Sequence, residues 1–209
     1  MLSEKEINYL ENRWVQDFNV YEDEVVLYTV YHGSPDKDIE EFNLRNVGSN
    51  LNLGHYGFGV YFTTDRDFAS IFATGGLDED DEDYEGGAVY QCELHFKNPF
   101  IPTNENILKL VNTQEFKSEF PNFDPTSLKM SRLNIQPTRG HNFPHSLGHY
   151  DSQCIIDFSE LTNNGWDGAR ELTTVLQSLG FDGLIYCDTE IVSFHPENQI
   201  EHLYIREIL

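Results

Sequence analysis

Three short segments of the chain carry residues whose types and order could support catalysis. The first is His32-Gly33-Ser34, at the end of an apolar stretch with strand character. The second, residues 57–63, reads GFGVYFT, a glycine-containing loop followed by an aromatic pair. The third is Glu190, which immediately precedes the apolar residues 191–194. Because residues at strand ends are held rigidly and can still face a cleft, an imidazole, a phenol ring and a carboxylate could be positioned in this way.

Each segment also has an ordinary structural explanation. Gly33 could supply an unusual φ in a turn, with His32 as a packed aromatic residue. Tyrosine and phenylalanine are good strand residues, so Tyr61 and Phe62 could simply be sheet core. A single glutamate at the start of a strand is usually an exposed edge charge. The glycine spacing of the loop does not fit GxGxxG and no helix opens after it, so it is not a dinucleotide fingerprint.

Taken together and in this order, the segments resemble the catalytic signature of ADP-ribosyltransferases of the His-Tyr-Glu type. This class includes diphtheria-toxin-like and poly(ADP-ribose)-polymerase-like enzymes. The matching residues are Tyr31-His32-Gly33-Ser34, then Gly57-Phe58-Gly59-Val60-Tyr61-Phe62-Thr63, then Glu190-Ile191-Val192-Ser193-Phe194. Residues 93–99 (ELHFKNP) and 179–186 (LGFDGLIY) are similar to phage and bacterial members of the superfamily. The resemblance covers about residues 26–101 and 166–205.

The resemblance implies that NAD⁺ is the substrate and loses nicotinamide through an oxocarbenium-like transition state. Such a state needs a held leaving group, a constrained ribose and nearby negative charge. In the family, the backbone of the glycine matching Gly33 hydrogen-bonds the carboxamide, and the tyrosine matching Tyr61 stacks on the nicotinamide. The histidine matching His32 holds a ribose hydroxyl. The glutamate matching Glu190 binds the nicotinamide-ribose 2′-hydroxyl as an ionised carboxylate, which an ordinary Glu pKa of about 4.3 permits.

Further NAD⁺ contacts follow from the same resemblance. Ser34 is expected among the binding residues beside the histidine and glycine. A second wall for the nicotinamide would come from the helix after the tyrosine strand, where Phe72 could stack or Ser70 could hydrogen-bond. Phe72 is equally a natural core residue of that helix. Asp188, two residues before the glutamate, is expected to help orient the acceptor.

The charge of the chain limits its partners. Its 209 residues include 36 acidic and 13 basic side chains, a net charge of −23. A chain this acidic is a poor candidate for gripping phosphate backbones or anionic membranes through a broad basic face. NAD⁺ carries a pyrophosphate, however, so a local cationic or amide pocket is required. Arg45 and the backbone amides of residues 46–54 are the expected place for it.

Composition and pattern favour an α+β fold. A hydrophobic content of 39% with 13% aromatic residues fits a folded globular protein. Many short strands and few crossover-length helices favour antiparallel pairing, and the resemblance implies split antiparallel β-sheets flanked by short helices. We expect one domain over 1–209 with an insertion at about 102–150, where no compact hydrophobic core suggests itself. The expected helices are 4–14, one from Asp65 through Ala73, one after Thr103, and 167–179 ending at Gly180; the expected strands are 25–31, 60–63, 88–96, 153–158, 183–187, 190–195 and 199–207.

Metal and disulfide chemistry are not indicated. Three histidines recur every four residues with an aspartate nearby, but a proline and a glycine between them disfavour a helix. They are expected to be polar loop residues, and a metal site formed by this loop is the alternative. No metal is expected. The three cysteines form no CxxC pair, which favours a reducing compartment, and no apolar leader or membrane span is evident. These residues are His141, His145, His149 and Asp151, with Pro144 and Gly148 between them, and Cys92, Cys154 and Cys187.

The favoured interpretation is a cytoplasmic mono-ADP-ribosyltransferase that modifies a macromolecule, protein rather than nucleic acid, as a toxin, effector or phage-type modifier. A host-protein target or a cognate antitoxin is a possible partner, and no membrane partner is expected. An NAD⁺ glycohydrolase would use the same residues. A non-catalytic acidic decoy is a further alternative, motivated by the net charge and by the run DEDDEDYE at 78–85. Basic residues in the insertion could contact the acceptor: Lys109, Lys117, Lys129, Arg132 and Arg139.

Overall fold

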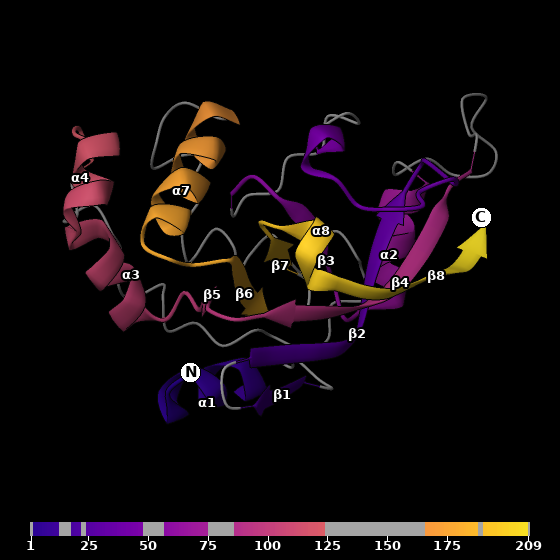
Figure 1. Cartoon of the computed structure of the whole chain (residues 1–209), viewed down its shortest axis with the longest axis horizontal. Helices are drawn as coiled ribbons and strands as arrows, with labels where there is room; N and C mark the ends of the chain where they lie inside the picture. Colours follow the sequence, from indigo (N-terminus) through magenta and orange to yellow (C-terminus); the bar gives the residue numbers. More distant parts are fainter. Residues whose placement is uncertain are drawn as a thin grey trace.

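Two four-stranded β-sheets form the centre of the molecule (Figure 1). The structure is a computed structural model, which describes residues 2–12, 18–21, 24–47, 57–74, 86–123, 166–187 and 190–208. One sheet, here sheet A, has the order β1-β2-β4-β8, and the other, sheet B, has the order β3-β7-β6-β5. All pairings are antiparallel except β5 with β6. The strands are β1 (Phe18–Tyr21), β2 (Glu24–Ser34), β3 (Val60–Phe62), β4 (Ala88–Phe96), β5 (Pro99–Phe100), β6 (Gly183–Cys187), β7 (Glu190–Ser193) and β8 (Ile200–Ile208).

Short helices cover these sheets, and the predicted α+β class is confirmed. Sheet B is the middle layer, because alternate residues of its strands face opposite cores. Ile185 and Ile191 pack toward sheet A, whereas Leu184 and Val192 pack against α3, α4 and α7. None of the described helices is long and apolar enough to cross a membrane. The helices are α1 (Glu4–Asn12), the 3-10 turn η1 (Leu44–Asn46), α2 (Arg66–Ala73), α3 (Asn104–Asn112), α4 (Gln114–Glu119), α7 (Trp166–Ser178) and α8 (Pro196–Gln199).

Helix α2 packs on the outer face of sheet A with backbone almost touching backbone. Asp65 caps it, as predicted, by accepting from two backbone N–H groups of the first turn. Ala69 and Ala73 are its buried residues. A Cβ on Gly33 would lie 1.7 Å from the Ala69 carbonyl oxygen, and one on Gly87 would lie 1.9 Å from that of Ala73. The two glycines therefore permit close approach of the helix to the sheet.

The end of β2 differs from the sequence expectation. The predicted strand stopped at residue 31, with His32-Gly33-Ser34 as a terminating turn. In the structure β2 continues to Ser34, because β4 pairs with it as far as the Ser34–Ala88 contact. The expectation of Gly33 as a turn residue was therefore wrong, and the glycine lies in a regular strand beneath α2.

The first part of the expected insertion contributes to the core. Buried apolar residues of α3 and α4 pack with α7 in the cluster that covers sheet B; they are Ile107, Leu110, Val111, Phe116 and Phe120. The expectation that this stretch lacks a hydrophobic core was wrong for residues 104–120, while the single-domain assignment stays a prediction. Residues 124–150 of the insertion and the strand predicted at 153–158 lie outside the described residues.

Two of the segments that resemble phage and bacterial relatives meet in space and hold the sheets together. The carboxylate of Asp182, just before β6, accepts hydrogen bonds from the backbone N–H groups of Lys97 and Asn98, at 2.7 and 3.0 Å. The Asn98 side chain donates to the Gly180 carbonyl at 2.9 Å. The pairing explains both motifs structurally, because it joins the turn after β4 to the turn after α7.

Candidate active site

Backbone hydrogen bonds bring the three candidate segments onto neighbouring strands. Tyr31 of β2 and Thr63, which directly follows β3, exchange N–H···O bonds of 2.7 and 2.9 Å. On its other side β3 pairs with β7, in a register that includes the Phe62–Ile191 pair. Strand β7 begins at Glu190, one residue before that pair. Since adjacent strands lie about 4.8 Å apart, the backbone of Glu190 is placed about two strand spacings from β2.

His32 is held in one tautomer by a backbone carbonyl. Its Nδ1 lies 2.8 Å from the carbonyl oxygen of Tyr61. A carbonyl only accepts, so Nδ1 carries the hydrogen, and in the neutral imidazole Nε2 keeps its lone pair. Desolvation lowers the pKa of His32, an effect only partly offset by the Tyr61 hydrogen bond. Phe42 and Phe62 pack against the ring at centroid distances of 4.8 and 5.7 Å, so a neutral acceptor nitrogen is presented in a fixed orientation.

Gly33 leaves two backbone groups at the edge of β2. Peptide groups alternate between the two sides of a strand, and those of Tyr31 bond Thr63. The N–H and C=O of Gly33 therefore point to the β3 side as well, where continued antiparallel pairing beyond Tyr31–Thr63 would bring Tyr61 opposite Gly33. Among the described residues, no hydrogen bond outside the regular helices and strand ladders involves either group. An adjacent donor and acceptor at this edge match the donor and acceptor of a primary carboxamide.

Hydrogen bonds connect the glycine loop, residues 57–59, to Tyr61 and to α7. The Tyr61 hydroxyl donates to the Gly57 carbonyl at 2.7 Å. The Thr173 hydroxyl accepts from the N–H of Phe58 at 2.7 Å and donates to its carbonyl at 3.2 Å. The Arg170 guanidinium lies 4.8 Å above the Phe58 ring. Gly57 has φ +116°, and a Cβ there would lie 2.7 Å from the threonine hydroxyl, so only glycine fits.

Sequence reasoning missed the contribution of α7 to this loop. Thr173 and Arg170 belong to a helix recognised only by its apolar face. The signal available in the sequence was Thr173, a threonine on the otherwise apolar face of the helix. This signal does not identify the residue that the threonine contacts. Thr173 lies 115 residues after Phe58 in the sequence and holds the loop in place by their hydrogen bond.

The two candidates for a second nicotinamide wall lie on opposite flanks of α2. Residues two apart on a helix are separated by about 200°. Ser70 donates its hydroxyl to a backbone carbonyl of its own helix, at 2.7 Å. Phe72 is 39% exposed and contacts the Phe68 ring at 5.2 Å. The alternative that Phe72 is a core residue was wrong, because the buried face of α2 is formed by Ala69 and Ala73.

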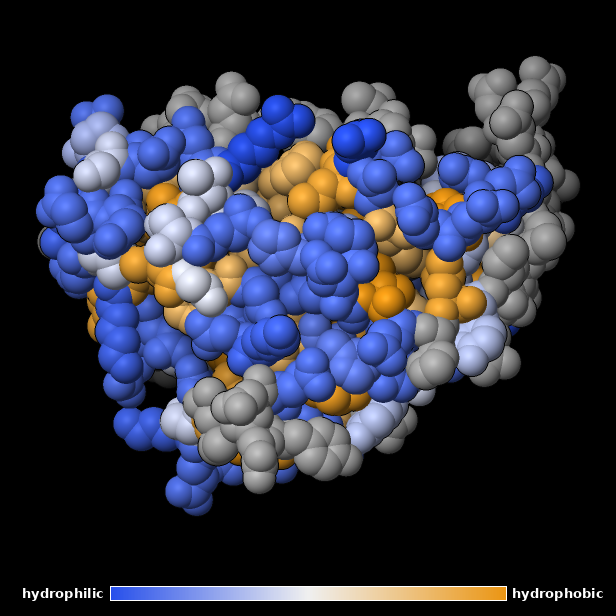
Figure 2. Space-filling model, viewed as in Figure 1, coloured by the Kyte–Doolittle hydropathy of each residue, from blue (hydrophilic) through white to orange (hydrophobic). Residues whose placement is uncertain are grey.

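Ser34 comes before and Arg45 comes after Phe42, the residue whose ring contacts His32. Ser34 is buried, and its hydroxyl oxygen accepts from the backbone N–H of Asp36 at 3.1 Å, which shapes the chain leaving β2. Arg45 is exposed in η1, three residues after Phe42, the ring that contacts His32. Figure 2 shows an apolar area between the hydrophilic surfaces over α7 and over η1.

Several predicted residues lie outside the described residues. They are Asp188, residues 48–54 of the amide pocket, the acidic run 78–85, His141, His145, His149, Lys129, Arg132 and Arg139. For Glu190 the structure describes the backbone position in β7, and its side chain lies outside the described part. The catalytic and binding roles assigned from the sequence stay predictions.

One family model matches most of the chain. Residues 23–203 match the family model described as "ADP-Ribosyltransferase in polyvalent proteins". A search of curated proteins and a search of solved structures found no significant match. The matched range spans most of the chain and includes β2, β3 and β7, the strands that carry all three candidate segments. The chain therefore belongs to this family and is an ADP-ribosyltransferase.

Proposed function

We propose that this ADP-ribosyltransferase takes ADP-ribose from NAD⁺, releases nicotinamide and transfers one ADP-ribose unit to a protein acceptor. The observation that carries the proposal is the alignment of β2, β3 and β7. Through the Tyr31–Thr63 bridge and the β3–β7 ladder, it gathers the positions of His32, Tyr61 and Glu190. Enzymes of the family use NAD⁺ in general, and the geometry at β2 supports the same donor here.

The edge of β2 supplies the groups that would hold the nicotinamide and a ribose. The Gly33 N–H donates to the carboxamide oxygen and its C=O accepts from the carboxamide NH₂. The Tyr61 ring stacks on the pyridinium, its position fixed by the bond to Gly57. The His32 Nε2 lone pair accepts a hydrogen bond from a ribose hydroxyl, because the Nδ1 hydrogen is engaged by the Tyr61 carbonyl.

Glu190 would supply the negative charge at the reacting carbon. Its carboxylate binds the 2′-hydroxyl and stabilises the cation that develops at C1′. The C1′–N bond breaks with its electron pair leaving on nicotinamide. An acceptor nucleophile then forms a bond to C1′ and loses its proton. Asp188, two residues earlier, orients that nucleophile in this proposal.

Arg45 is the proposed pyrophosphate contact. It lies in η1, which follows the segment that touches His32 through Phe42. An exposed arginine can bind two phosphate oxygens at once, which a lysine cannot do with the same geometry. With backbone amides beside it, such a contact would offset the net charge of −23 locally.

The acceptor and setting are also proposals. The acidic composition favours a protein acceptor over nucleic acid, and we propose a cytoplasmic modifier of the toxin, effector or phage type, with a host protein as target or an antitoxin as partner. Of the basic residues suggested as acceptor contacts, Lys109 pairs with Glu105 at 2.9 Å and Lys117 donates to the Asn112 carbonyl at 3.0 Å. The family assignment favours this enzymatic interpretation over an acidic decoy.

The test measures nicotinamide release and acceptor labelling together. The protein is incubated with NAD⁺ and a host-type protein extract, and both products are quantified by mass spectrometry. We expect Glu190→Gln to lower both by about 100-fold or more, while Glu197→Gln, an exposed carboxylate on α8, leaves them unchanged. Nicotinamide release without a labelled protein would identify a glycohydrolase, and equal rates for the two variants would refute the assignment of Glu190.

A further inference from the structure

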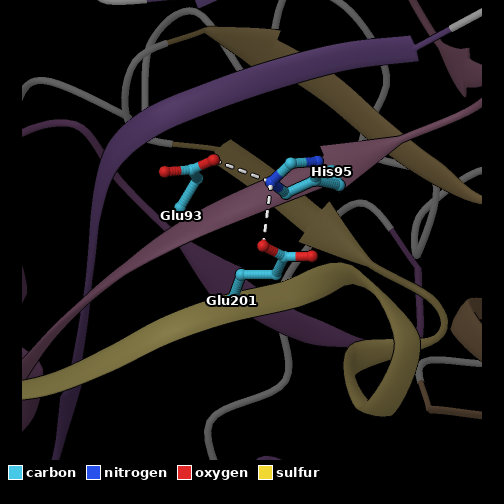
Figure 3. A group of neighbouring side chains, drawn as sticks. All are labelled: Glu93, His95 and Glu201. Atoms are coloured by element: carbon cyan, nitrogen blue, oxygen red, sulfur yellow. Dashed lines mark hydrogen bonds and ion pairs between the residues drawn. The ribbon is translucent and has the colours of Figure 1, made fainter.

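A histidine with three glutamates around it lies on the outer face of sheet A, away from Val89, against which α2 packs. Figure 3 shows His95 with two of these glutamates, Glu93 and Glu201. Glu93 and His95 are alternate residues of β4, whereas Leu94 between them faces the core. Glu201 of β8 pairs in register with Glu93. Glu24, the first residue of β2, approaches the imidazole from the other side. Three strands thus contribute to one cluster.

The two ring nitrogens have different surroundings. Nε2 lies 2.8 Å from Oε1 of Glu93 and 3.8 Å from Oε2 of Glu201. Nδ1 lies 3.2 Å from Oε2 of Glu24. One ligand atom each of Glu93, His95 and Glu201 falls within 4.8 Å of the others. The His95 and Glu93 side chains are 20% and 22% exposed, so water competes little at that end of the cluster.

We propose that Glu93, His95 and Glu201 bind a divalent transition-metal ion of the Zn²⁺ class. Tetrahedral Zn²⁺ with bonds of about 2.0–2.1 Å holds its ligand atoms about 3.3 Å apart, and the two distances from Nε2, 2.8 and 3.8 Å, bracket that spacing. An imidazole combined with carboxylates is a donor set that Zn²⁺ accepts, and the imidazole disfavours Mg²⁺ and Ca²⁺. Water would complete the fourth position.

Glu24 would hold the histidine that binds the ion, without binding the ion itself. A histidine that ligates a metal through one nitrogen commonly donates its other N–H to a carboxylate, which fixes the ring and raises its basicity. The 3.2 Å contact of Nδ1 with Glu24 has this form and leaves Nε2 directed at the other two carboxylates. The imidazole is therefore held between carboxylates at both of its nitrogens.

A proton is the competing occupant. An Nε2 without a hydrogen and an ionised carboxylate are both acceptors, so a separation of 2.8 Å requires either a hydrogen on Nε2 or a metal ion between the two atoms. Partial burial lowers the pKa of His95, but hydrogen bonds to Glu24 and Glu93 and the charges of Glu24 and Glu201 outweigh it and raise the pKa. The metal would displace this proton, and the experiment must separate the two occupants.

The site is distant from the proposed NAD⁺ contacts. His32 pairs with Tyr90, which precedes His95 by five strand positions, or about 17 Å. A metal here would tie β4 to β8 and so stabilise sheet A without taking part in the transfer. The proposal is therefore independent of the proposed function, although it departs from the expectation of no metal drawn from the sequence.

Calorimetric titration of the metal-stripped 209-residue chain with Zn²⁺ tests the site. We expect one ion per chain, no binding of Mg²⁺ or Ca²⁺ at equal concentration, and a rise in Tm with Zn²⁺. Glu201→Gln and His95→Gln should weaken binding more than 100-fold and abolish the Tm rise. Glu24→Gln should weaken binding by about 10-fold, and Glu197→Gln on α8 should have no effect.

Three histidines outside the described residues provide the decisive control. His141, His145 and His149 could bind Zn²⁺ instead, so His145→Gln is titrated beside the sheet variants. Binding that survives Glu201→Gln and disappears in His145→Gln would overturn the proposal, as would a wild-type chain that binds no Zn²⁺. If His95→Gln fails to fold, Glu201→Gln decides, because the variant is isosteric and its residue is 60% exposed. Its transferase activity should be unchanged.

Discussion

The close packing of α2 on β2 makes Gly33→Ala the most informative single substitution. The added Cβ would lie 1.7 Å from the Ala69 carbonyl oxygen and 2.8 Å from the backbone nitrogen of Ala73. Ordinary non-bonded contacts of carbon are about 3.5–4.0 Å, so α2 must retreat by about 2 Å. Both clashing atoms are backbone, so no side-chain rotation relieves them.

The loss of stability should lie at the upper end of the range that overpacking of a protein core produces. Moving α2 outward also opens space beneath Ala69 and Ala73, so we expect a loss of about 3 kcal/mol in the free energy of unfolding. With a urea m-value of about 2 kcal/mol/M, the midpoint of unfolding falls by about 1.5 M. Because α2 carries both Ser70 and Phe72, nicotinamide release should fall as well.

Gly180→Ala is the matched control. Gly180 has φ +88°, and the position that an added Cβ would take has nothing within 4 Å, so alanine there meets strain without a clash. Its cost should be about 1 kcal/mol with unchanged activity. Urea denaturation followed by circular dichroism compares the two. If Gly33→Ala costs no more than Gly180→Ala, the backbone contact between α2 and β2 is not as described.

Three further predictions follow from other contacts. Thr173→Val removes the hydroxyl that bonds the N–H and the C=O of Phe58 in the glycine loop. It should lower the free energy of unfolding, measured in urea, by about 1–2 kcal/mol and raise the KM for NAD⁺. Thr174→Val, at an exposed position of the same helix, should change neither quantity. Asp182→Ala removes the acceptor of two backbone N–H groups and should cost about 2–3 kcal/mol in the same assay, and a loss below about 0.5 kcal/mol would contradict that role. Because desolvation lowers the pKa of His32, its contribution to stability is full above the unfolded value of about 6.5 and is lost as the pH falls through the lower folded value. An NMR titration of the ring should give a pKa below about 6.5, and a value above about 6.5 would contradict the desolvation of the ring.

Local patterns predicted the elements whose signals lie within a few residues. The Asp65 cap and the apolar spacing after it predicted α2, and the alternation in residues 88–96 predicted β4. Gly180 was predicted as the residue that ends α7, and its φ of +88° confirms it. The short strands β5 and β1 were missed, because nothing in their own sequence marks them and they are defined by pairing with a partner strand.

The candidate site was predictable in its parts but not in its arrangement. The order of the histidine, tyrosine and glutamate segments is visible in the sequence and identified the superfamily. The tautomer of His32 could not be predicted from the sequence, because it depends on a hydrogen bond to the carbonyl of Tyr61. That carbonyl reaches the histidine only when β3 lies beside β2. Thr173 was missed for the same reason, since its hydrogen bonds join two elements far apart in the chain.

By itself the sequence determined the fold class, the acidic character and the three segments that mark an ADP-ribosyltransferase. Only the tertiary structure decided that Gly33 lies in a strand under α2, that the glycine loop is fastened to α7, and that His95 stands between glutamates of three strands. The physical reason is that helix caps and apolar periodicity act between neighbours in sequence, whereas strand register and close backbone contact depend on partners that only folding brings together.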